Sequence, residues 1–572
     1  MEKSAVAAML SEIAVILDIL GENPFKVKAH QSAARAIETL PGDLDEIMAG
    51  DHLTDIKGIG SHIAEKIKTF AAAGALPELE ALRKKVPAGL FDILKIPGLG
   101  PKKAKALWDK LGVTTIRELE YACNENRLVE LSGFGAKSQE NIIKGIKNVT
   151  KFAGRRLAPE AFAAAGPVIE WVLKGPAVKR AQLAGSVRRG LETVKDIDIV
   201  ASSQNPEKVM DRFVKAPGVA EIIGQGPTKS SIRLESGFQV DLRVVDDAQY
   251  PFALHHFTGS REHNTLMRSR AKAMGLKMNE YGVFRGEKLI ACGDEEEIFA
   301  ALKLAYIPPE LREGIDEIDE SEKGRIPKLV EPGDITGIFH AHTVASDGVD
   351  TLENMAAACK KMGSKYLGIS EHSRTAAYAG GLSIDELEKQ GDEIDEVNAK
   401  LSGFRVFKGV ESDILNDGSL DYPDKVLAKL DFVIASVHSG FNMDEKKMTE
   451  RIVRAIENPF TTMLGHPTGR LLLARDGYPV NMGKVIEACA KHDVIIELNA
   501  NPHRLDIDWR VMKLAKDAGV KISVNPDAHR VSGLADVAWG VAAARKGWLE
   551  KGDVFNTMAP DKIEKELERR KK

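Results

Sequence analysis

Two aspartates stand two residues apart in the segment 183–200, which reads LAGSVRRGLETVKDIDIV. In a β-strand, residues at this spacing project from one face, so the carboxylates of Asp196 and Asp198 point one way and the isoleucines between and after them point into the core. Two like charges side by side are costly unless a cation lies between them. Hard divalent ions such as Mg²⁺ bind carboxylate oxygens, so the spacing predicts a metal site.

A second candidate strand, residues 238–244, places Asp241 and Arg243 on one face. Three aspartates on adjacent strands would hold two metal ions, roughly 3.5–4 Å apart, for in-line phosphoryl transfer. In that arrangement Asp196 and Asp198 bridge both ions, and Asp241 holds the ion that activates the attacking 3′-hydroxyl. The pattern is typical of nucleotidyl transfer.

A Gly-Ser turn and two arginines precede the paired aspartates. The backbone at Gly185 and the hydroxyl of Ser186 are suited to meet a triphosphate. Either Arg188 or Arg189 would neutralise the negative charge of that triphosphate. These residues therefore predict a nucleotide-binding position beside the metal site.

Three short segments near the N-terminus share an x-G-x-G pattern between helical stretches. Their glycines are Gly58, Gly60, Gly98, Gly100, Gly133 and Gly135. Such a turn directs backbone N–H groups outward, and together with the following helix N-terminus it binds phosphate without reading bases. The first two continue as GxGxxxA, whereas the third has Gln139 in place of Ala. The segments resemble helix-hairpin-helix DNA-binding motifs.

Charge supports an anionic partner at one place in the chain. Residues 101–200 carry 18 Lys and Arg against 11 Asp and Glu, although the whole chain has a net charge of −4. A basic block in a mildly acidic chain favours contact with nucleic acid.

Lys66 follows the first hairpin and cannot share a helix face with Lys68. A lysine made neutral by its surroundings can form a Schiff base with a sugar aldehyde. The alternative is a lysine that contacts phosphate or solvent, and the local sequence leaves both open.

The C-terminal half repeats one pattern from residue 336 onward: a short apolar run, one or two metal-binding residue types, then a helical stretch. Alternating strands and helices predict parallel β/α architecture, in which residues at successive strand ends meet at one barrel mouth. The residues at these ends include His340, His342, Glu371, His372, Glu411, His438, His466, Glu497, Asn499, Asp527 and His529.

Six histidines at strand ends, together with acids, favour a metal centre over six separate structural roles. Ligands of the His, Asp and Glu types without Cys indicate Zn²⁺ or Mn²⁺ rather than a structural zinc knot. Several ions this close would supply a hydroxide and bind a phosphate, so we expect phosphoester hydrolysis.

The first ~315 residues resemble a family X DNA polymerase, the group that contains polymerase beta. The resemblance implies that Asp196, Asp198 and Asp241 are the catalytic metal ligands and that Lys66 is the Schiff-base lysine for 5′-deoxyribose-phosphate removal. The residues that match nucleotide contacts are Gly185, Ser186, Arg189, Phe257, Gly259, Asn264 and Arg268. His256 stands where the family often has Tyr, and His62 replaces a basic residue near the lysine. The segment 266–312 fits the thumb, with a helix, strands around 281–290 and a helix from Glu295.

Residues 336 to about 570 resemble the PHP (polymerase and histidinol phosphatase) domain, through motifs that include His340-x-His342, Ser346-Asp347-Gly348 and Asp527-x-His529. The resemblance implies up to three metal ions. The first ion would use His340, His342, Glu411 and Asp527; the second Glu411, His438 and His466; and the third Asp347, His372 and His529.

At 572 residues the chain is long enough for three to five domains. We expect a multidomain α/β protein. Its domains are a lyase-like helical DNA-binding domain (1–90), helix-hairpin-helix fingers (91–150), a palm with a mixed sheet (151–253), a thumb (254–315), an acidic, proline-containing linker (316–335) and a PHP domain with a distorted β/α barrel (336–572).

No apolar run reaches the ~20 residues that span a bilayer, and the N-terminus lacks a signal peptide pattern. The four cysteines lie far apart without a CxxC motif, which excludes a disulfide framework and fits a reducing cytoplasm.

These features predict a DNA-directed DNA polymerase that fills short gaps in repair with Mg²⁺ or Mn²⁺. A PHP 3′-5′ exonuclease, and with it cleavage at abasic sites, would use Mn²⁺ or Zn²⁺. Its partners would be gapped or primer-template DNA and dNTPs, with the chain a monomer. Two alternatives remain. A nucleotidyltransferase for RNA or a small molecule would not need the DNA-binding hairpins, and a DNA end-bridging scaffold with an inactive nuclease would not need intact ligand sets.

Overall fold

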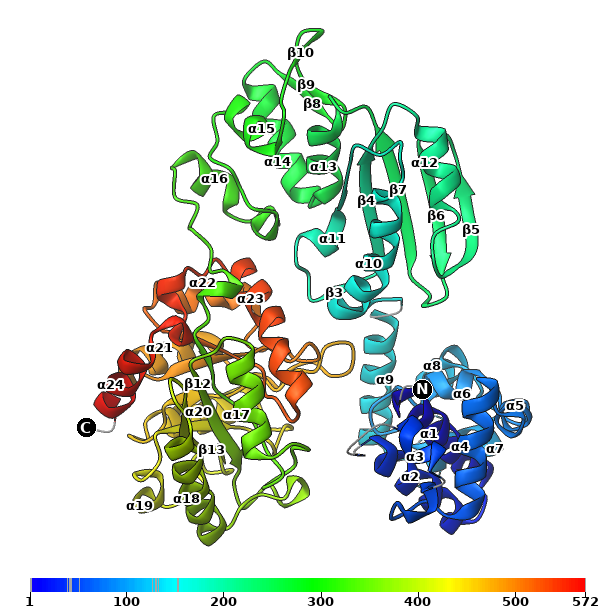
Figure 1. The fold of residues 1–572 in the computed structure, drawn as a ribbon, viewed down its shortest axis with the longest axis vertical. Coiled ribbons are helices and arrows are strands. Elements are labelled where there is room, and N and C mark those ends of the chain that lie inside the picture. Colours follow the sequence, from blue (N-terminus) through cyan, green and yellow to red (C-terminus); the bar gives the residue numbers. More distant parts are fainter. Residues whose placement is uncertain are drawn as a thin grey trace. The chain divides into compact units, whose positions relative to one another are not determined.

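The computed structural model of the chain describes residues 3–38, 40, 44–50, 52–125, 127–128, 131, 133–151 and 154–570. The chain divides into two compact units, residues 1–153 and 154–572. The elements of each unit can be traced separately in Figure 1.

The first unit is helical. Its first helix, α1 (Lys3–Leu20), carries Val6, Leu10, Ile13 and Leu17 on one stripe, and all four are buried in the core of this unit. The other elements are α2 (Pro24–Glu38), α3 (Leu44–Ala49), η1 (Leu53–Asp55), α4 (Ser61–Ala73), α5 (Pro77–Arg83), α6 (Gly89–Ile93), α7 (Pro101–Leu111), α8 (Ile116–Asn124) and α9 (Ala136–Lys151). The predicted helical N-terminal region is confirmed.

The second unit opens with a mixed five-stranded sheet in the order β2-β4-β7-β6-β5. Its elements are β1 (Arg156–Leu157), α10 (Ala158–Leu173), β2 (Arg180–Leu183), α11 (Gly185–Arg188), β3 (Thr193–Val194), β4 (Asp196–Ser202), α12 (Pro206–Phe213), β5 (Val219–Gln225), β6 (Lys229–Leu234), β7 (Gln239–Val245) and α13 (Tyr250–Thr258). Ile197 and Ile199 of β4 are buried against α10 and α12. Asp196 and Asp198, which alternate with these isoleucines as the sequence predicted, therefore point away from this core.

A helix, a small antiparallel sheet and a second helix follow, as the sequence predicted. They are α14 (Arg261–Ala273), β8 (Lys277–Asn279), β9 (Gly282–Arg285), β10 (Lys288–Ile290) and α15 (Glu295–Ala301), with η2 (Pro309–Leu311) after them. Phe299 of α15 is fully buried in the core of this region.

The segment 316–335, which we expected to be a linker, contains two short helices and four buried residues, while half of its residues are exposed. It contains α16 (Glu317–Glu322) and η3 (Pro332–Asp334). Glu317 is fully buried and its Oε1 lies 2.8 Å from Nδ1 of His263. Acidic composition alone suggested solvent exposure, but this carboxylate is buried because it has a histidine partner.

Seven parallel strands in chain order, β11 to β17, form the predicted barrel (Figure 1). The strands are β11 (Gly337–Ile338), β12 (Tyr366–His372), β13 (Arg405–Asp413), β14 (Phe432–Ser436), β15 (Met463–Leu464), β16 (Ile495–Asn499) and β17 (Ile522–Asn525). A parallel bridge between Ala341 and Ala528 brings the first and last strands together, so the barrel is nearly closed.

Helices connect the barrel strands, and others follow the last strand, β17. They are α17 (Leu352–Lys361), η4 (Ala377–Ala379), α18 (Ile384–Lys400), α19 (Asp424–Leu427), α20 (Glu445–Ile456), α21 (Met482–His492), α22 (Trp509–Asp517), η5 (Val531–Asp536), α23 (Val537–Lys546), η6 (Lys551–Asp553), η7 (Phe555–Thr557) and α24 (Pro560–Arg570). The strands are buried on both faces, which explains their continuous apolar sequences.

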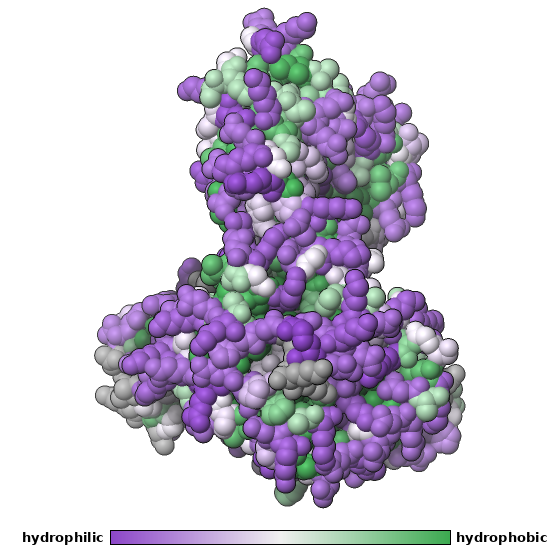
Figure 2. Space-filling model, turned by 90° about the vertical axis from the view of Figure 1, so that its left-hand side faces the viewer, coloured by the Kyte–Doolittle hydropathy of each residue, from purple (hydrophilic) through white to green (hydrophobic). Residues whose placement is uncertain are grey.

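Among the described residues, no helix is both long and apolar enough to cross a membrane. The face drawn in Figure 2 is mainly hydrophilic, and its apolar side chains lie in small separate patches. All four cysteines are buried free thiols.

Candidate active sites

The palm sheet brings its three predicted aspartates together. Strands β4 and β7 are parallel neighbours, and Asp198 is the direct partner of Asp241 in their register. Burial, followed by the charges of Asp196 and Asp241, raises the pKa of Asp198 to about 6. Such a cluster of carboxylates is stabilised by cations, so the donor set fits divalent ions.

Gly185 lies against this cluster and must be glycine there. Its φ is +59°, and a Cβ added to it would lie 2.1 Å from Oδ2 of Asp198. The first turn of α11, with Ser186, therefore approaches the carboxylates closely, as a triphosphate-binding turn requires.

The two arginines after this turn have different partners. Arg188 forms an ion pair with Glu295, with 2.5 Å between Nη2 and Oε2, and Nη1 donates to Oγ1 of Thr258. Arg189 donates from Nε to Oε1 of Glu313 over 3.0 Å and from Nη1 to the carbonyl of Thr258. Burial and the neighbouring carboxylates raise the pKa of Asp198, and the charge of Arg189 partly opposes this increase, whereas the charge of Arg188 is paired with Glu295.

The segment 256–268 joins α13 to α14 beside the palm. Nδ2 of Asn264 donates to the carbonyl of His256 over 2.7 Å, and the ring of Phe257 lies under the guanidinium of Arg243, 4.4 Å away. Arg268 is exposed on α14. Burial lowers the pKa of His256, so its imidazole is neutral near pH 7.

Gly259 follows α13 with a φ of +73°, and a Cβ added to it would lie 3.0 Å from Nη1 of Arg189. Gly259 and Arg189 are thus adjacent, whereas Arg268 is two turns further along α14 than Arg261, the first residue of that helix. The structure brings most of the predicted nucleotide-binding residues to one edge of the palm.

In the helical unit, the three hairpins lie where the sequence placed them. Gly58, Gly98 and Gly133 have φ values of +100°, +83° and +87°, and α4, α7 and α9 start directly after the second glycine of each pair. Added Cβ atoms at Gly60, Gly100 and Gly135 would meet no described atom within 4 Å. The backbone there is open to a ligand. Ser132 of the third hairpin lies outside the described residues.

Lys66 lies on α4 and is largely buried. Its Nζ is 2.8 Å from Oε1 of Glu78 and 3.1 Å from Nε2 of His30. A Schiff base would form at Nζ, and in the structure this nitrogen is held in an ion pair.

In the barrel, the predicted ligands gather around Glu411 of β13. Oε1 of Glu411 is 2.8 Å from Nε2 of His466, 3.2 Å from Nε2 of His438 and 3.3 Å from Nε2 of His340. Its Oε2 is 2.9 Å from Nδ1 of His372. Nε2 of His342 is also 3.7 Å from Oε2, so one buried carboxylate faces five histidines from four strand ends, which suits a bridging ligand.

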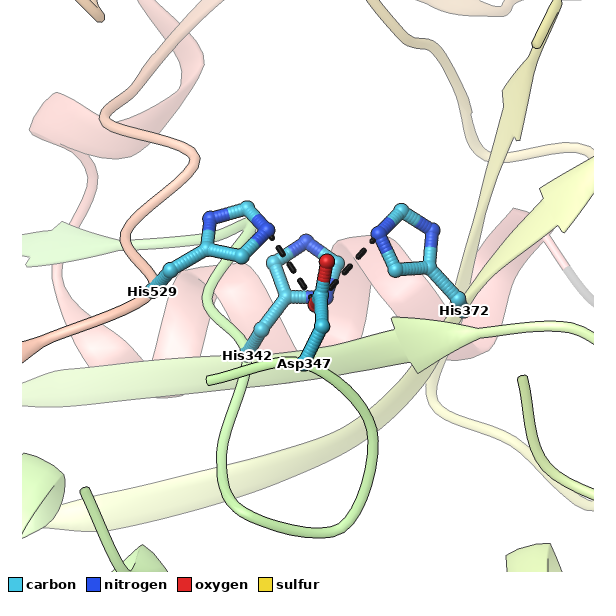
Figure 3. Close-up of side chains that lie close together, drawn as sticks. All are labelled: His342, Asp347, His372 and His529. Carbon is cyan, nitrogen blue, oxygen red and sulfur yellow. Dashed lines mark ion pairs between the residues drawn. The ribbon is translucent and has the colours of Figure 1, made fainter. Parts of the chain in front are cut away.

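A second group surrounds Asp347, which extends from the loop after β11 (Figure 3). Its Oδ1 is 3.2 Å from Nε2 of His529 and 3.6 Å from Nε2 of His372. The ring of His342 is stacked between those of His372 and His529, at 4.4 and 4.3 Å. These four residues form one metal-competent group.

His342 also belongs to a third group, with His340 and Asp527. Oδ1 of Asp527 is 3.3 Å from Nε2 of His342 and 3.4 Å from Nε2 of His340. The resemblance placed His342 with this group only, whereas in the structure it lies between two groups.

The cluster has the chemistry of a metal-ligand set. Burial alone would lower the pKa values of His372, His438 and His529, but nearby carboxylates outweigh it and raise them to about 10, 9 and 9. Buried atoms without a hydrogen-bond partner among the described residues gather here: Nε2 of His340, both ring nitrogens of His342, Nδ1 of His372 and His466, and Oε2 of Glu411. Imidazole and carboxylate donors in this state fit Mn²⁺ or Zn²⁺.

Sequence reasoning placed Glu497 among the metal-binding residue types at strand ends, but it gave no orienting role to Glu497 or to Asp413. Oε1 of Glu497 is 2.5 Å from Nδ1 of His340, and Oε2 accepts from the backbone N–H of His466. Asp413 holds Nδ1 of His438 at 2.6 Å. Both acids are strand residues, Asp413 two positions after a ligand, which is the one signal the sequence contained.

Glu371 has a related role. It accepts hydrogen bonds from the backbone and hydroxyl of Thr343, and from Ser346 and Gln390. These bonds fix the loop that carries Asp347.

Comparison with known proteins matches four segments to family models. They are a helix-hairpin-helix domain over residues 1–76, a SAM-like helix-hairpin-helix tandem over 91–148, a DNA polymerase beta thumb over 253–313 and a PHP domain over 339–501.

Among curated proteins, the DNA polymerase/3'-5' exonuclease PolX of Bacillus subtilis is 39% identical over 573 residues, covering 100% of both chains. Probable phosphatases of Thermoanaerobacter sp. and Caldicellulosiruptor saccharolyticus are 30% and 31% identical, over 33% and 34% of this chain and 77% and 81% of theirs.

Proposed function

Because this chain belongs to the family X DNA polymerases that carry a PHP domain, we propose that it fills short DNA gaps during repair and trims 3′ ends at a second site. It is a DNA polymerase and a 3′-5′ exonuclease, and it depends on divalent metal ions. The observation that carries the proposal is the presence of two separate carboxylate-centred clusters, at Asp198 and at Glu411, on one chain.

In the polymerase site, Asp196, Asp198 and Asp241 would hold two Mg²⁺ or Mn²⁺ ions. Bound ions of this kind stabilise the charge on the attacking 3′-hydroxyl and on the leaving pyrophosphate. The register pairing of Asp198 with Asp241 fixes their separation before substrate arrives. That preorganisation lowers the cost of assembling the transition state.

The incoming nucleotide would lie between α11 and the segment 256–268. Gly185 and Ser186 would offer backbone and hydroxyl donors to the triphosphate, and Arg189 would neutralise part of its charge. Phe257 and Gly259 would contact the sugar, as the resemblance implies, with Asn264 near the base pair and Arg268 towards the template. The bond from Asn264 to the His256 carbonyl supports this arrangement.

DNA would be held by its phosphates at the hairpin glycines of the helical unit. The open backbone at Gly60, Gly100 and Gly135 supports this role. Contacts of this kind position DNA without reading sequence. We assign residues 1–90 and 91–150 to DNA binding, 151–253 and 254–315 to palm and thumb, and 336–572 to the nuclease.

In the barrel, up to three Mn²⁺ or Zn²⁺ ions would be held by the ligands around Glu411, Asp347 and Asp527. Bound ions of this kind supply a hydroxide near neutral pH and stabilise the phosphorane-like charge. Glu497 and Asp413 would keep His340 and His438 in the orientation that binding needs. Cleavage beside abasic sites also breaks a phosphodiester bond and would use the same metal ligands.

Gap filling is tested with three duplexes that share one labelled primer: a one-nucleotide gap with a 5′-phosphate, a five-nucleotide gap, and an open template. The proposal predicts the highest kcat/KM on the one-nucleotide gap and a stop when the gap is full. Equal kcat/KM on all three duplexes would contradict the gap-filling role but not the polymerase activity. A tetrahydrofuran site in the same duplex tests abasic cleavage, which His342→Ala should abolish.

A further inference from the structure

The last residue of helix α23 in the PHP half, Lys546, is built into the polymerase site. Its side chain is fully buried, and its Nζ forms an ion pair with Oε1 of Glu313. The same ammonium donates to the carbonyls of Arg189 and Glu310, each over 3.2 Å. All of these residues belong to the unit 154–572.

Glu313 is shared by two cations. Its Oε1 accepts from Nε of Arg189 and also from Lys546, so a single oxygen links the two. Arg189 and Glu313 are both mostly buried, with side-chain exposures of 12% and 16%. Charges in such a place interact strongly, because little water screens them.

The charge balance of this triad decides what Arg189 can offer a triphosphate. With Arg189, Glu313 and Lys546 all ionised, the group carries one net positive charge. Without Lys546, the carboxylate would cancel the charge of Arg189 and leave none for the ligand. Lys546 thereby frees the arginine electrostatically while Glu313 holds it in place.

The surroundings keep Lys546 fixed. Its Nζ lies 4.6 Å from the ring centroid of Trp509, whose Nε1 donates to Oε2 of Glu192 over 3.2 Å. Arg510 pairs with the other oxygen of Glu192. Glu192 follows the arginine turn by three residues, so a second contact holds the same palm loop against the PHP half.

We propose that Lys546 is a positioning residue of the polymerase reaction: the PHP half neutralises Glu313 through it, so that Arg189 keeps a positive charge for the nucleotide triphosphate. The inference rests on the proposed role of Arg189 in nucleotide binding. It predicts that polymerase and nuclease halves are coupled through nucleotide affinity and not through the nuclease ligands.

The test is steady-state insertion of one nucleotide into a one-nucleotide gap at saturating DNA. Lys546→Met should raise KM for the dNTP about tenfold, equivalent to ~1.4 kcal/mol, with kcat nearly unchanged. Glu313→Gln in the same chain should restore KM to within about threefold of wild type, because Gln keeps the oxygen that Arg189 binds and removes the charge. A lysine with only a structural role would not be rescued in this way.

Lys516→Met is the matched control. Lys516 is another lysine of the PHP half, with 21% of its side chain exposed, and it pairs with Glu550 and Asp553 of that half. Its loss should leave KM for the dNTP unchanged. The 3′-5′ exonuclease rate and the melting temperature of each variant report folding.

The outcomes separate the two claims. If Arg189→Ala leaves KM unchanged, the proposed role of Arg189 in nucleotide binding is wrong. If Arg189→Ala raises KM and Lys546→Met does not, only the inference about Lys546 is overturned. If Lys546→Met raises KM and Glu313→Gln fails to restore it, the charge mechanism is overturned. If Lys546→Met does not fold, the double variant that combines Lys546→Met with Glu313→Gln is compared with Glu313→Gln alone. A KM for the dNTP about tenfold higher in the double variant than in Glu313→Gln would contradict the proposal.

Discussion

Asp198 on β4 and Asp241 on β7 are direct partners in a parallel ladder, so their carboxylates leave the same face of the palm sheet side by side. Burial and the neighbouring carboxylates together raise the pKa of Asp198 to about 6. The strand pairing therefore holds like-charged carboxylates close together, and bound divalent ions would reduce the repulsion between them.

A dependence on pH and metal follows from this pair. Below pH 6 the carboxyl of Asp198 is mostly protonated, so a metal ion must displace a proton in order to bind. Above pH 6 the carboxylate is already ionised and binds the metal ion directly. The Mg²⁺ concentration for half-maximal polymerase activity should fall as pH rises from 5 to 7, and raising Mg²⁺ should move the activity midpoint to lower pH. Asp198→Asn should lack both polymerase activity and this dependence. A half-maximal Mg²⁺ concentration that is constant from pH 5 to 7 would contradict it.

The buried carboxylate of Glu295 predicts acid sensitivity of the palm and thumb. Burial opposes its ionisation, but Arg312 and Arg188 outweigh this and lower its pKa to about 2 from an ordinary value of 4.5. A lowered folded-state pKa adds stability above pH 4.5, worth about 3 kcal/mol, which is lost as pH falls from 4.5 to 2.

Glu295→Gln should reduce the free energy of unfolding by about 3–5 kcal/mol near pH 7, because it leaves Arg188 and Arg312 buried without their anion. Urea unfolding at pH 7 and at pH 3, inside the window between 4.5 and 2, measures this. Glu322→Gln, which removes the surface partner of Arg270, is the control and should behave as wild type.

The ion pair between Lys66 and Glu78 predicts weak Schiff-base formation. Borohydride trapping on 5′-deoxyribose-phosphate DNA should be low in wild type and absent in Lys66→Ala. Glu78→Gln should increase trapping, because it breaks the ion pair that holds Nζ of Lys66. Trapping that persists in Lys66→Ala would assign the chemistry to another amine.

Glu497 predicts a metal-affinity defect confined to the nuclease. Glu497→Gln weakens the support of His340, which should lower Mn²⁺ affinity about 10- to 100-fold. Exonuclease activity should fall at micromolar Mn²⁺ and recover at millimolar Mn²⁺, with gap filling unchanged. Glu564→Gln, which removes a surface partner of Arg405, should have no effect.

Most of the fold could be predicted from sequence because local signals agreed with it. The alternation around Asp196 and Asp198 marked a strand with one buried face, and each barrel ligand followed an apolar run that became a parallel strand. Because the carboxyl ends of parallel barrel strands converge, the sequence also predicted that these ligands would lie together at one mouth of the barrel.

What sequence could not give were pairings between distant segments. Lys546 meets Glu313 from 233 residues away, and Glu497 meets His340 from 157. Neither has a spacing signal of its own. The position of His342 between two metal groups also depends on ring stacking in three dimensions.

The central claim is that one chain holds two independent active sites. A one-nucleotide gapped duplex with a labelled primer, dNTPs and Mn²⁺ or Mg²⁺ tests it with wild type, Asp198→Ala and His342→Ala. We predict that Asp198→Ala loses extension but keeps 3′ shortening, and that His342→Ala does the reverse. Extension that survives in Asp198→Ala, or shortening that survives in His342→Ala, would contradict the assignment of that site.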